Sequence, residues 1–365
     1  MNLDAFHVIM AGGSGTRFWP VSRAARPKQF LTIAGDKPLI RQAWDRAVSM
    51  SGPGNVFVAA GRAQREMVLA ALPDLDPARF IGEPSARNTA PCIGLAALRL
   101  RRLEPDRVMV AAPADHLYKR PESLAAAIEE AARAARGSGA LVTLGIRPTR
   151  PETSFGYIEV EPGRPAGPPS GARRALRFVE KPDAATARGW VADGRHLWNS
   201  GVFIWKIGAI LEALEKSVPD LWRGMLEIER ALGGPGEDDV VARVFENLAP
   251  CSIDYAVMEK AREVLVVEVD PGWSDVGSWD AVAELQDTDA AGNSVLSIAA
   301  GETLTLGSRD TFIYSGSDRF IAVAGVEDLV IVDGPDALLI CRRGESQSVR
   351  AVVEALKARG RNDLL

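Results

Sequence analysis

Short apolar runs alternate with longer amphipathic stretches over the first 150 residues of the chain. The runs have the length of buried strands, and the stretches between them repeat apolar side chains at the three- and four-residue spacing of a helix. Strands and helices in alternation predict an α/β fold, with a mostly parallel mixed sheet that carries helices on both faces. The expected strands are 6–10, 56–60, 79–81, 108–112 and 141–146, and the expected helices are 40–50, 64–72, 89–103 and 122–136.

The pattern between residues 150 and 290 combines a hairpin with further helices. Residues 155–160 and 173–179 are expected to form the strands of a long hairpin around a Pro- and Gly-rich loop at 162–171. A helix over 252–262 is expected to begin at Ser252, a residue type that caps helices. The remaining expectations are a strand at 264–269 and helices at 184–193, 207–216, 220–232 and 279–285.

Beyond residue 290 the chain consists of short β-rich pieces, separated by Gly, Asp and Ser turns. Such pieces suit a small all-β module or a short β-solenoid, closed here by a helix at 349–358. We therefore expect an α/β domain over residues 1–289 and a β-rich module over residues 290–365 that serves packing or a dimer contact. The expected strands of the module are 294–299, 303–306, 311–314, 320–324, 329–333 and 337–341.

Composition narrows the class of protein. A net charge of −5 argues against a general nucleic-acid binder, which usually carries a basic excess. No apolar run reaches the ~18 residues of a membrane span, and the start of the chain lacks the charged and apolar regions of a signal peptide. Cys92, Cys251 and Cys341 are too scattered for a disulfide framework or a metal knuckle. We expect a cytoplasmic protein that binds neither nucleic acid nor membrane.

A glycine-rich loop follows the first expected strand. Gly12, Gly13 and Gly15 allow backbone N–H groups to approach phosphate oxygens closely, because glycine has no Cβ and adopts left-handed conformations. Arg17 and Lys28 follow, and their charges suit a triphosphate. A flexible turn beside surface basic residues would show the same glycines. The basic and proline residues that follow the glycines, up to position 29, favour phosphate binding over a flexible turn.

Two better-known phosphate motifs do not fit this loop. A P-loop requires Gly-Lys-Ser/Thr after four intervening residues, and none follows. A dinucleotide fingerprint requires a third glycine at the position of Phe18. The loop therefore belongs to another class of phosphate-binding site.

The stretch from Met10 to Pro20, MAGGSGTRFWP, with Pro27-Lys28 after it, resembles the signature of the sugar-phosphate nucleotidyltransferase family. Within that family, Trp19-Pro20 and Pro27-Lys28-Gln29-Phe30 are similar to the bacterial branch of mannose-1-phosphate guanylyltransferases. The resemblance covers residues 6 to about 285 and more loosely the remainder. It implies the Rossmann-like nucleotide-diphospho-sugar transferase fold, with residues 1–289 as the catalytic domain. It also implies Arg17 and Lys28 as catalytic residues, and nucleotide contacts from Ala11, Gly12, Gly13, Ser14, Gly15 and Thr16.

A second segment, Gly82 to Ala90 (GEPSARNTA), follows a strand and opens a helix. Its plain interpretation is a capped helix start with surface charges. A carboxylate there can also accept hydrogen bonds from guanine N1–H and N2–H₂, which uracil and thymine cannot offer, and a buried acceptor left unpaired penalises the wrong base. The segment resembles the family's guanine-contacting segment, and the candidates for reading the base are Glu83, Arg87 and Asn88.

Two aspartates far apart in the sequence each follow the end of an expected strand. Asp115 and Asp275 could each be an ordinary loop residue or helix cap. The family resemblance assigns both to Mg²⁺, which prefers one or two carboxylates plus substrate phosphate oxygens. It also places Pro113 and Ala114 at the nucleotide. His116 could act as a base, but an orienting role is preferred.

Further motifs resemble the sugar-phosphate site of the family. In Phe178-Val179-Glu180-Lys181-Pro182 the resemblance implies that Glu180 binds sugar hydroxyls and that Lys181 holds the sugar phosphate as a catalytic group. Trp198-Asn199-Ser200-Gly201 implies a sugar contact from Asn199. Where the branch has Thr-Gly-Tyr-Gly-Tyr-Ile, this chain has Thr153-Ser154-Phe155-Gly156-Tyr157-Ile158. Gly156 and Tyr157 are retained, and the resemblance implies that they contact the sugar. Ser154 and Phe155 differ from the branch, so strict selectivity for mannose stays open. The segment 252–260 is interpreted as a helix that borders the site.

The reaction implied by the resemblance is attack of a mannose 1-phosphate oxygen on the α-phosphorus of GTP, which gives GDP-mannose and pyrophosphate. The nucleophile is already ionised at neutral pH, so positioning, Arg17, Lys28, Lys181 and Mg²⁺ would carry the catalysis. The alternatives are a uridylyl- or thymidylyltransferase of the same family and a non-catalytic regulatory subunit. Many relatives carry a further cupin domain; residues 293–365 lack the clustered histidines for one, and a homodimer is compatible with the chain.

Overall fold

The computed structural model describes residues 3–13, 15–163 and 171–365, without the side chain of Thr16. Contacts divide the chain into two compact units. Unit 1 comprises Met1–Gly12, Ala43–Ala114 and Tyr118–Trp273, and unit 2 comprises Gly13–Gln42, Asp115–Leu117 and Ser274–Leu365. The expected division at residue 289 follows the order of the sequence and stays a prediction. The units differ from it because residues 13–42 and 115–117 group with the C-terminal part of the chain.

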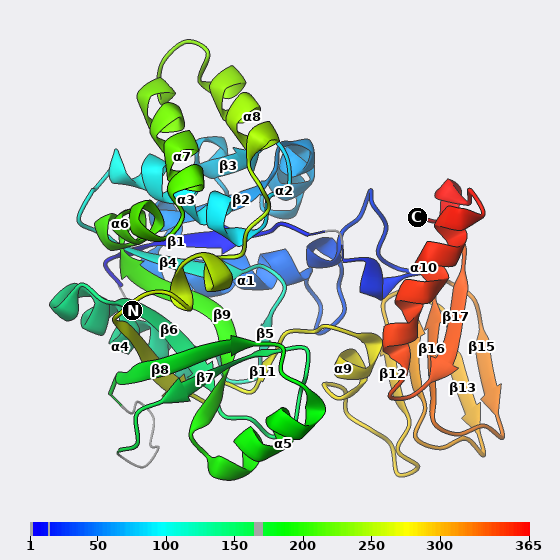
Figure 1. Cartoon of the computed structure of the whole chain (residues 1–365). Coiled ribbons are helices and arrows are strands. Elements are labelled where there is room, and N and C mark those ends of the chain that lie inside the picture. The colour runs from blue at the N-terminus through cyan, green and yellow to red at the C-terminus, as the bar shows by residue number, and fades with distance from the viewer. Residues whose placement is uncertain (1–2, 14, 164–170) are drawn as a thin grey trace. The chain divides into compact units, whose positions relative to one another are not determined.

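Unit 1 is built on a mixed sheet with the strand order β3-β2-β1-β4-β9-β6-β10-β8-β7 (Figure 1). β8 and β9 run against the other strands of this sheet. The long strand β9 was not expected from the sequence, and it pairs with both β4 and β6. The strands are β1 (Ala5–Met10), β2 (Val56–Gly61), β3 (Phe80–Glu83), β4 (Val108–Pro113), β6 (Leu141–Ile146), β7 (Gly156–Val160), β8 (Arg173–Glu180), β9 (His196–Lys206) and β10 (Val264–Val269).

Helices cover both faces of this sheet, as predicted. Along β4, Val108 and Val110 join a core with α4, whereas Met109 and Ala111 join a second core with α3, α6, α7 and α8. Because successive side chains of a strand point to opposite faces, the two cores lie on opposite sides of the sheet. The helices are α1 (Leu39–Ser51), which crosses from unit 2, α2 (Arg65–Ala71), α3 (Thr89–Arg101), α4 (Pro121–Ser138), α5 (Ala184–Asp193), α6 (Ile207–Ser217), α7 (Pro219–Ala231) and α8 (Glu237–Asn247).

Two helical segments differ from the sequence prediction. α8 was not expected; its acidic start follows a run of glycines that breaks the pattern. The helix expected over 252–262 is instead a π-helical turn, η6 (Asp254–Met258). Ser252 acts near its start as foreseen, since its Oγ accepts a hydrogen bond from Tyr255 N at 3.3 Å. π-helical turns are rare and frequently lie at functional sites.

The C-terminal part of unit 2 is a β-helix. β12, β14 and β16 pair in parallel, as do β13 and β15, and every paired residue lies 18 positions from its partner, for example Ser294 and Phe312. One coil therefore contains two strands and spans 18 residues. The expected β-rich, solenoid-like module is confirmed. Its elements are β12 (Ser294–Ser297), β13 (Thr303–Leu306), β14 (Phe312–Ser315), β15 (Ile321–Ala324), β16 (Leu329–Asp333), β17 (Leu338–Arg342) and α10 (Val349–Ala358).

Beside a smaller apolar cluster within the β-helix, unit 2 has an apolar core of its own. It joins Phe18 and Trp19 of the N-terminal segment to Trp279 of α9 (Trp279–Ala283), to Phe312 of the β-helix and to Val349 of α10. Figure 1 shows α10 running along the strands of the β-helix. In the described ranges of the chain, no helix is both long enough and apolar enough to cross a membrane.

Candidate functional site

Several of the predicted site residues line one charged pocket in unit 2. Its volume is about 260 Å³. It lies entirely within unit 2, although its residues come from three separate segments of the sequence. The lining residues are Gly15, Arg17, Phe18, Lys28, Asp115, His116, Asp275, Val276 and Gly277.

Lys28 occupies the centre of this pocket. Its buried side chain donates from Nζ to Asp115 Oδ2 at 2.8 Å and to the backbone oxygen of Asp275 at 2.7 Å. Both predicted metal ligands are thus in contact with the same ammonium group, although 160 positions separate them in the sequence. The short 3-10 helix η2 (Lys28–Phe30), whose three residues are buried, fixes the start of the Lys28 side chain.

Gly15 fits against Lys28 only because it is glycine. A Cβ on Gly15 would lie 2.4 Å from the Lys28 Cβ, and the φ of Gly15 is +60°, a left-handed conformation. Its carbonyl oxygen accepts hydrogen bonds from Ser22 Oγ at 2.7 Å and from Phe18 N at 3.0 Å. The glycine loop is therefore closed on itself and held against the ammonium group. Ser14 lies outside the described residues.

Arg17 lies in the same pocket as the two aspartates. Burial lowers the pKa of Arg17, and the charge of Arg350 in α10 lowers it further, against the opposing charges of Asp275 and Asp115. Two guanidinium groups close together are typical of sites that bind polyvalent anions. The pocket thus combines cationic groups with carboxylates.

The two carboxylates have pKa values that move in opposite directions. Burial would raise the pKa of Asp115, but the charges of Lys28 and His116 hold it below its usual value. Burial, and after it the charge of Asp115, raise the pKa of Asp275 against the opposing charge of Lys28. Repulsion between two carboxylates in one pocket is relieved by a cation. Their donor set therefore fits a divalent cation that completes its shell with water and phosphate oxygens.

The loop around Asp275 is held in an unusual conformation. Asp275 Oδ1 accepts a hydrogen bond from Gly277 N at 3.1 Å, and a Cβ on Gly277 would lie 2.7 Å from Asp275 Oδ2. Val276, between them, has φ of +47°, which a β-branched residue rarely adopts. Across the described part of the chain, no group of three or more His, Cys, Asp or Glu side chains is placed to hold a metal ion. A cation here would depend on Asp115 and Asp275.

In unit 1, Glu83 ends β3 and its carboxylate is buried against Cys92 of α3. Burial raises the pKa of Glu83, and the Cys92 thiol, which donates a hydrogen bond to it, opposes the shift. A thiol is a weak donor. The carboxylate therefore retains capacity to accept stronger hydrogen bonds.

Arg87 and Asn88 have local structural partners. The Arg87 guanidinium donates to Phe245 O at 2.6 Å and to Glu246 O at 2.7 Å, so it caps the carboxyl end of α8. Asn88 is the N-cap of α3, where its Oδ1 accepts from Thr89 N at 2.8 Å. Of the three predicted base-reading residues, Glu83 is the one whose polar group is not engaged with backbone.

Gly156, Glu180 and Asn199 come together at the carboxyl end of β6. Gly156 pairs with Glu180, and Asn199 lies opposite Gly145 of β6. A Cβ on Gly156 would lie 2.3 Å from Glu180 Oε1 and 3.5 Å from the Asn199 Cβ, so glycine leaves the space that both side chains occupy. Three residues predicted from separate motifs thus form one cluster.

Asp254 belongs to this cluster and was not selected from the sequence. The Asn199 Nδ2 donates to Asp254 Oδ1 at 2.7 Å, while the Asn199 Oδ1 accepts from Gly201 N at 3.2 Å. Burial, and after it the charge of Glu180, raise the pKa of Asp254 to about 6. The sequence signal for Asp254 is its place as an acidic residue at the start of the apolar turn in segment 252–260, which resembles the family branch. Lys181 is exposed, with φ of +51°, and its Nζ lies 3.3 Å from Glu180 Oε2.

Other predicted contacts lie in the interior of unit 1. Tyr157 is buried in the core, and its hydroxyl accepts a hydrogen bond from Glu152 N at 3.0 Å. Ala11 and Ala114 are buried, with backbone bonds to Ala59 and Met10 respectively. Gly12, at the end of the first segment of unit 1, and Gly13, which begins unit 2, are by contrast exposed.

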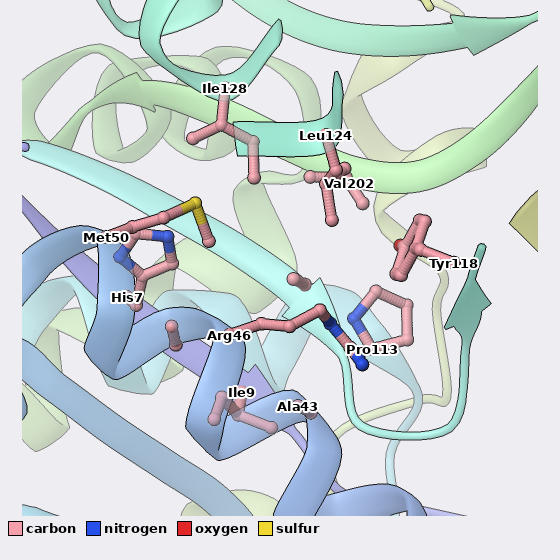
Figure 2. A pocket seen from close by; sticks show the side chains of 12 residues that line it. His7, Ile9, Ala43, Arg46, Met50, Pro113, Tyr118, Leu124, Ile128 and Val202 are labelled. Carbon is pink, nitrogen blue, oxygen red and sulfur yellow. The ribbon is translucent and has the colours of Figure 1, made fainter. Parts of the chain in front are cut away.

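Pro113 lines a small pocket together with residues of α1 and β1. Figure 2 shows Arg46 extending toward Pro113 and Tyr118, and the Arg46 guanidinium lies 4.9 Å from the centre of the Tyr118 ring. The volume of this pocket is about 30 Å³, which holds a water molecule or two but no nucleotide. Pro113 therefore lines a space too small for a nucleotide, although the residue itself is only half-buried.

Comparisons with known proteins agree with these features. The family model described as "Nucleotidyl transferase" matches residues 6–292, and one described as "MannoseP isomerase/GMP-like beta-helix domain" matches residues 301–356. The mannose-1-phosphate guanylyltransferase of Escherichia coli (strain K12) is 38% identical over 98% of this chain and 74% of its own length. The xanthan biosynthesis protein XanB of Xanthomonas campestris pv. campestris (strain B100) is 38% identical over 99% of this chain and 75% of its own.

A solved structure extends the agreement to the whole fold. The structure described as "mannose-1-phosphate geranyltransferase from Thermus thermophilus" superposes with a TM-score of 0.86 at 33% identity, covering 97% of this chain and 100% of that one. The family match covers the glycine loop, both aspartates and the cluster around Asn199. The chain belongs to the nucleotidyl transferase family and is a nucleotidyltransferase.

Proposed function

We propose that this enzyme transfers GMP from GTP to α-D-mannose 1-phosphate, with GDP-mannose and pyrophosphate as products and Mg²⁺ as cofactor. The observation that carries the proposal is the contact of Lys28 with Asp115 and with the backbone of Asp275, in a pocket that also holds Arg17. Such a set of charges suits the transfer of a nucleotidyl group between anions. The names of the relatives support mannose 1-phosphate as the acceptor.

In this reaction the acceptor needs no general base. The phosphate of the sugar is ionised at neutral pH, so the barrier comes from bringing two anions together and from the charge on the leaving pyrophosphate. Arg17 and Lys28 would offset this charge, and the backbone N–H groups of the glycine loop would bind phosphate oxygens. Lys181, which is exposed beside Glu180, would bind the phosphate of the sugar.

Asp115 and Asp275 would hold the magnesium ion. When bound, it would neutralise phosphate charge and orient the phosphate groups. The opposite shifts of their pKa values support this assignment. Lys28 stabilises the anionic form of Asp115, whereas for Asp275 the cost of burying the charge outweighs the attraction of Lys28. Lys28 keeps Asp115 ionised and therefore able to act as a ligand.

For the sugar we propose Glu180 and Asn199 as the hydroxyl-binding groups, with Gly156 as the surface between them. The chain departs from the family branch at Ser154 and Phe155, and this departure does not argue against the arrangement. Ser154 donates to Glu152 Oε1 from its N at 3.1 Å, and the Phe155 ring packs 5.2 Å from the Trp198 ring. Both residues thus have structural partners of their own.

For the base we propose Glu83 as the residue that reads guanine. Arg87 and Asn88 are engaged as caps of α8 and α3, whereas the hydrogen-bond partner of the Glu83 carboxylate among the described residues is a thiol. A carboxylate that is buried and incompletely paired discriminates strongly between a base that can donate to it and one that cannot. Cytoplasmic location and a homodimer stay predictions from the sequence.

A substrate panel tests the proposal. Pyrophosphate release is measured with GTP, UTP and dTTP, each combined with mannose, glucose and galactose 1-phosphates and Mg²⁺. We expect the highest kcat/KM for GTP with mannose 1-phosphate and retention of the anomeric configuration in the product. Preference for UTP or dTTP would indicate the related transferase instead. Nucleotide binding without turnover in any combination would indicate a regulatory subunit.

A further inference from the structure

The loop of residues 15–23 carries Arg17 and behaves as one structural piece. Gly15 O accepts hydrogen bonds from both Ser22 Oγ and Phe18 N, so the two ends of the turn are tied together. Gly15 is also packed against Lys28 without room for a Cβ. A displacement of residues 18–22 would therefore move Gly15, and with it the ammonium group at the centre of the charged pocket.

The indole N–H and the carbonyl oxygen of Trp19 are bonded to residues of unit 2 that are distant in the sequence. Its indole Nε1 donates to Leu364 O at 2.8 Å, and its carbonyl oxygen accepts from Trp279 Nε1 at 3.1 Å. Trp279 is fully buried and packs against Tyr314 of β14, with ring centres 5.0 Å apart. Trp19 is therefore held between residue 364 and the β-helix.

A second attachment lies at the end of the loop. Arg23 Nη2 bonds to Asp336 Oδ1 at 2.6 Å, and its guanidinium lies 5.6 Å from the centre of the Trp19 ring. Pro20 packs on Gly334, where an added Cβ would meet Pro20 carbons at 3.2 and 3.3 Å. Gly334 and Asp336 belong to the turn between β16 and β17, so this turn supports the loop directly.

The closing helix α10 adds both packing and charge. Val349 and Val353 lie in the same core as Phe18 and Trp19. Between them in sequence, Arg350 is close enough for its charge to lower the pKa of Arg17, second to burial. Residues 290–365 thus contact the loop through a backbone oxygen, an ion pair, a glycine surface and an apolar core.

We propose that the module of residues 290–365 is a positioning element of the charged pocket: through Trp19 and Arg23 it fixes the loop that carries Arg17 and packs against Lys28, the two groups that face substrate phosphates. The inference rests on the proposed function, since it assumes that phosphates occupy this pocket. It assigns to the module a part in the chemistry beyond packing or dimer contact. Trp19, Arg23 and Asp336 are positioning residues, because they act through Arg17 and Lys28.

The test compares two ion pairs of the same module. Asp336→Asn weakens the bond to Arg23, whereas the control Glu327→Gln weakens the exposed pair Arg309–Glu327, which does not touch the loop. Trp19→Phe removes the indole donor to Leu364 O and retains an aromatic ring. kcat and KM are measured with the best substrate pair of the panel, and thermal unfolding is followed for each variant.

We expect Asp336→Asn and Trp19→Phe to lower kcat by about 5- to 20-fold, because small displacements of charged groups are costly in catalysis. The KM for the sugar phosphate should stay within about twofold and Glu327→Gln should match the wild type. In an Arg17→Ala background, Asp336→Asn should lower kcat far less, since effects that act through one residue are not additive. This last comparison separates positioning from a general loss of structure.

Several outcomes would overturn the inference. Equal kinetics for Asp336→Asn and Glu327→Gln would do so, as would an undiminished effect of Asp336→Asn in the Arg17→Ala background. If Trp19→Phe fails to fold, Asp336→Asn decides, because Asp336 is about half exposed. Calorimetric binding of magnesium pyrophosphate gives an answer that does not depend on turnover: Asp336→Asn should weaken it about fivefold, and unchanged affinity would contradict the inference. A wild type without turnover would refute the proposed function alone.

Discussion

Single residues in strained backbone conformations lie at or beside the candidate sites. Asn88, Lys181 and Val276 have φ of +68°, +51° and +47°. Such conformations cost on the order of 1–3 kcal/mol each in residues other than glycine, and they persist where the surrounding structure imposes them. Asp310 and Asp328 also have positive φ, but they occupy equivalent turns of the β-helix. The strain beside Asp275 therefore supports a functional role for that loop.

Asp275→Asn should remove most of the activity at a fixed Mg²⁺ concentration. The amide keeps the size of the side chain but loses the charge that a hard cation prefers. We expect kcat/KM to fall by about 100-fold, or ~2.7 kcal/mol of transition-state stabilisation. Pyrophosphate release is measured over a range of Mg²⁺ concentrations. The control Asp270→Asn alters an exposed carboxylate paired with Arg120 and should be silent; near-normal turnover of Asp275→Asn would remove it from the metal site.

Buried His7 should make the protein less stable in mild acid. Burial lowers the pKa of His7 from 6.5 to about 4, and its Nε2 has no hydrogen-bond partner in the described part of the chain. Between pH 6.5 and pH 4 the unfolded chain binds more protons at this residue, so its contribution to stability is complete above pH 6.5 and is lost as pH falls toward 4.

The contribution of His7 amounts to about 3 kcal/mol over this range. Urea unfolding at several pH values checks it against His7→Asn, which does not titrate. The wild-type free energy of unfolding should fall more steeply toward pH 4 than that of the variant. Parallel curves for the two proteins would show that His7 is not responsible.

At the scale of elements, the ends of helices determine which predicted residues are available for a ligand. Arg87 caps α8 and Asn88 caps α3, so both are committed to backbone groups at helix ends. Thr89 adds a further link, since its Oγ1 accepts from Ile253 N at 2.8 Å, next to Asp254. The start of α3 and the π-helical turn are therefore tied together.

Arg87→Ala and Glu83→Gln should separate helix capping from base recognition. Arg87→Ala leaves two carbonyl groups of α8 without their donor and should lower the free energy of unfolding by about 2 kcal/mol, with the GTP preference retained. Glu83→Gln should leave stability nearly unchanged and reduce the preference for GTP over UTP at least tenfold. Thermal unfolding and the kcat/KM ratio for GTP and UTP measure both effects. An unchanged ratio in Glu83→Gln would refute the assignment to guanine.

Asp254→Asn should affect the sugar and leave the nucleotide unaffected. Asp254 orients the Asn199 amide, so the variant should raise the KM for the sugar 1-phosphate about tenfold, with the KM for GTP unchanged. Because its pKa is about 6, the wild type should lose kcat/KM below pH 6 relative to the variant. The phosphate of the sugar 1-phosphate titrates near the same pH, but its titration affects the wild type and the variant equally.

The ratio of wild type to variant as a function of pH therefore isolates Asp254. Glu263→Gln is the matched control, since Glu263 is an exposed acid that follows the same turn and does not contribute to the pKa of Asp254. A ratio that does not change between pH 5 and pH 7 would assign the pH dependence to the substrate alone.

At the scale of the whole molecule, the core of unit 2 joins residues from both ends of the chain. Phe18 and Leu31 share it with Phe312, Val330 and Val349. A boundary at residue 289 divides this core, although it matches the change of pattern in the sequence. The pattern along the sequence therefore divides the chain at residue 289, whereas packing groups residues from both ends of the chain into one unit.

A chain that ends at residue 289 should not be active. Removal of residues 290–365 exposes the apolar surface of Phe18 and Trp279 to water and deletes the groups that hold Trp19. We expect loss of turnover and of near-ultraviolet circular dichroism from the buried tryptophans, with partial recovery when residues 290–365 are co-expressed as a separate chain. A soluble and active 1–289 fragment would show that the catalytic domain is autonomous.

The sequence by itself determined the α/β alternation, the β-rich module and the glycine loop, because these depend on local patterns of apolar residues and on residue types with special backbone conformations. It could also select Arg17, Lys28, Asp115 and Asp275, since these residues belong to motifs that resemble the family, and the structure brings them into one pocket. It could not find β9, which pairs with strands distant in the sequence, or the 18-residue coil, whose two strands belong to different sheets.

Only the tertiary structure decided which residues share an environment. It brought Asp254 to Asn199, and it directed Arg87 to the end of α8. It also fixed the loop of residues 15–23 on the C-terminal module through Trp19. These relations depend on contacts between residues far apart in the sequence, and burial and charge acquire their values only from such contacts. Residue types and local spacing define what a side chain can do, whereas packing determines which partner it meets.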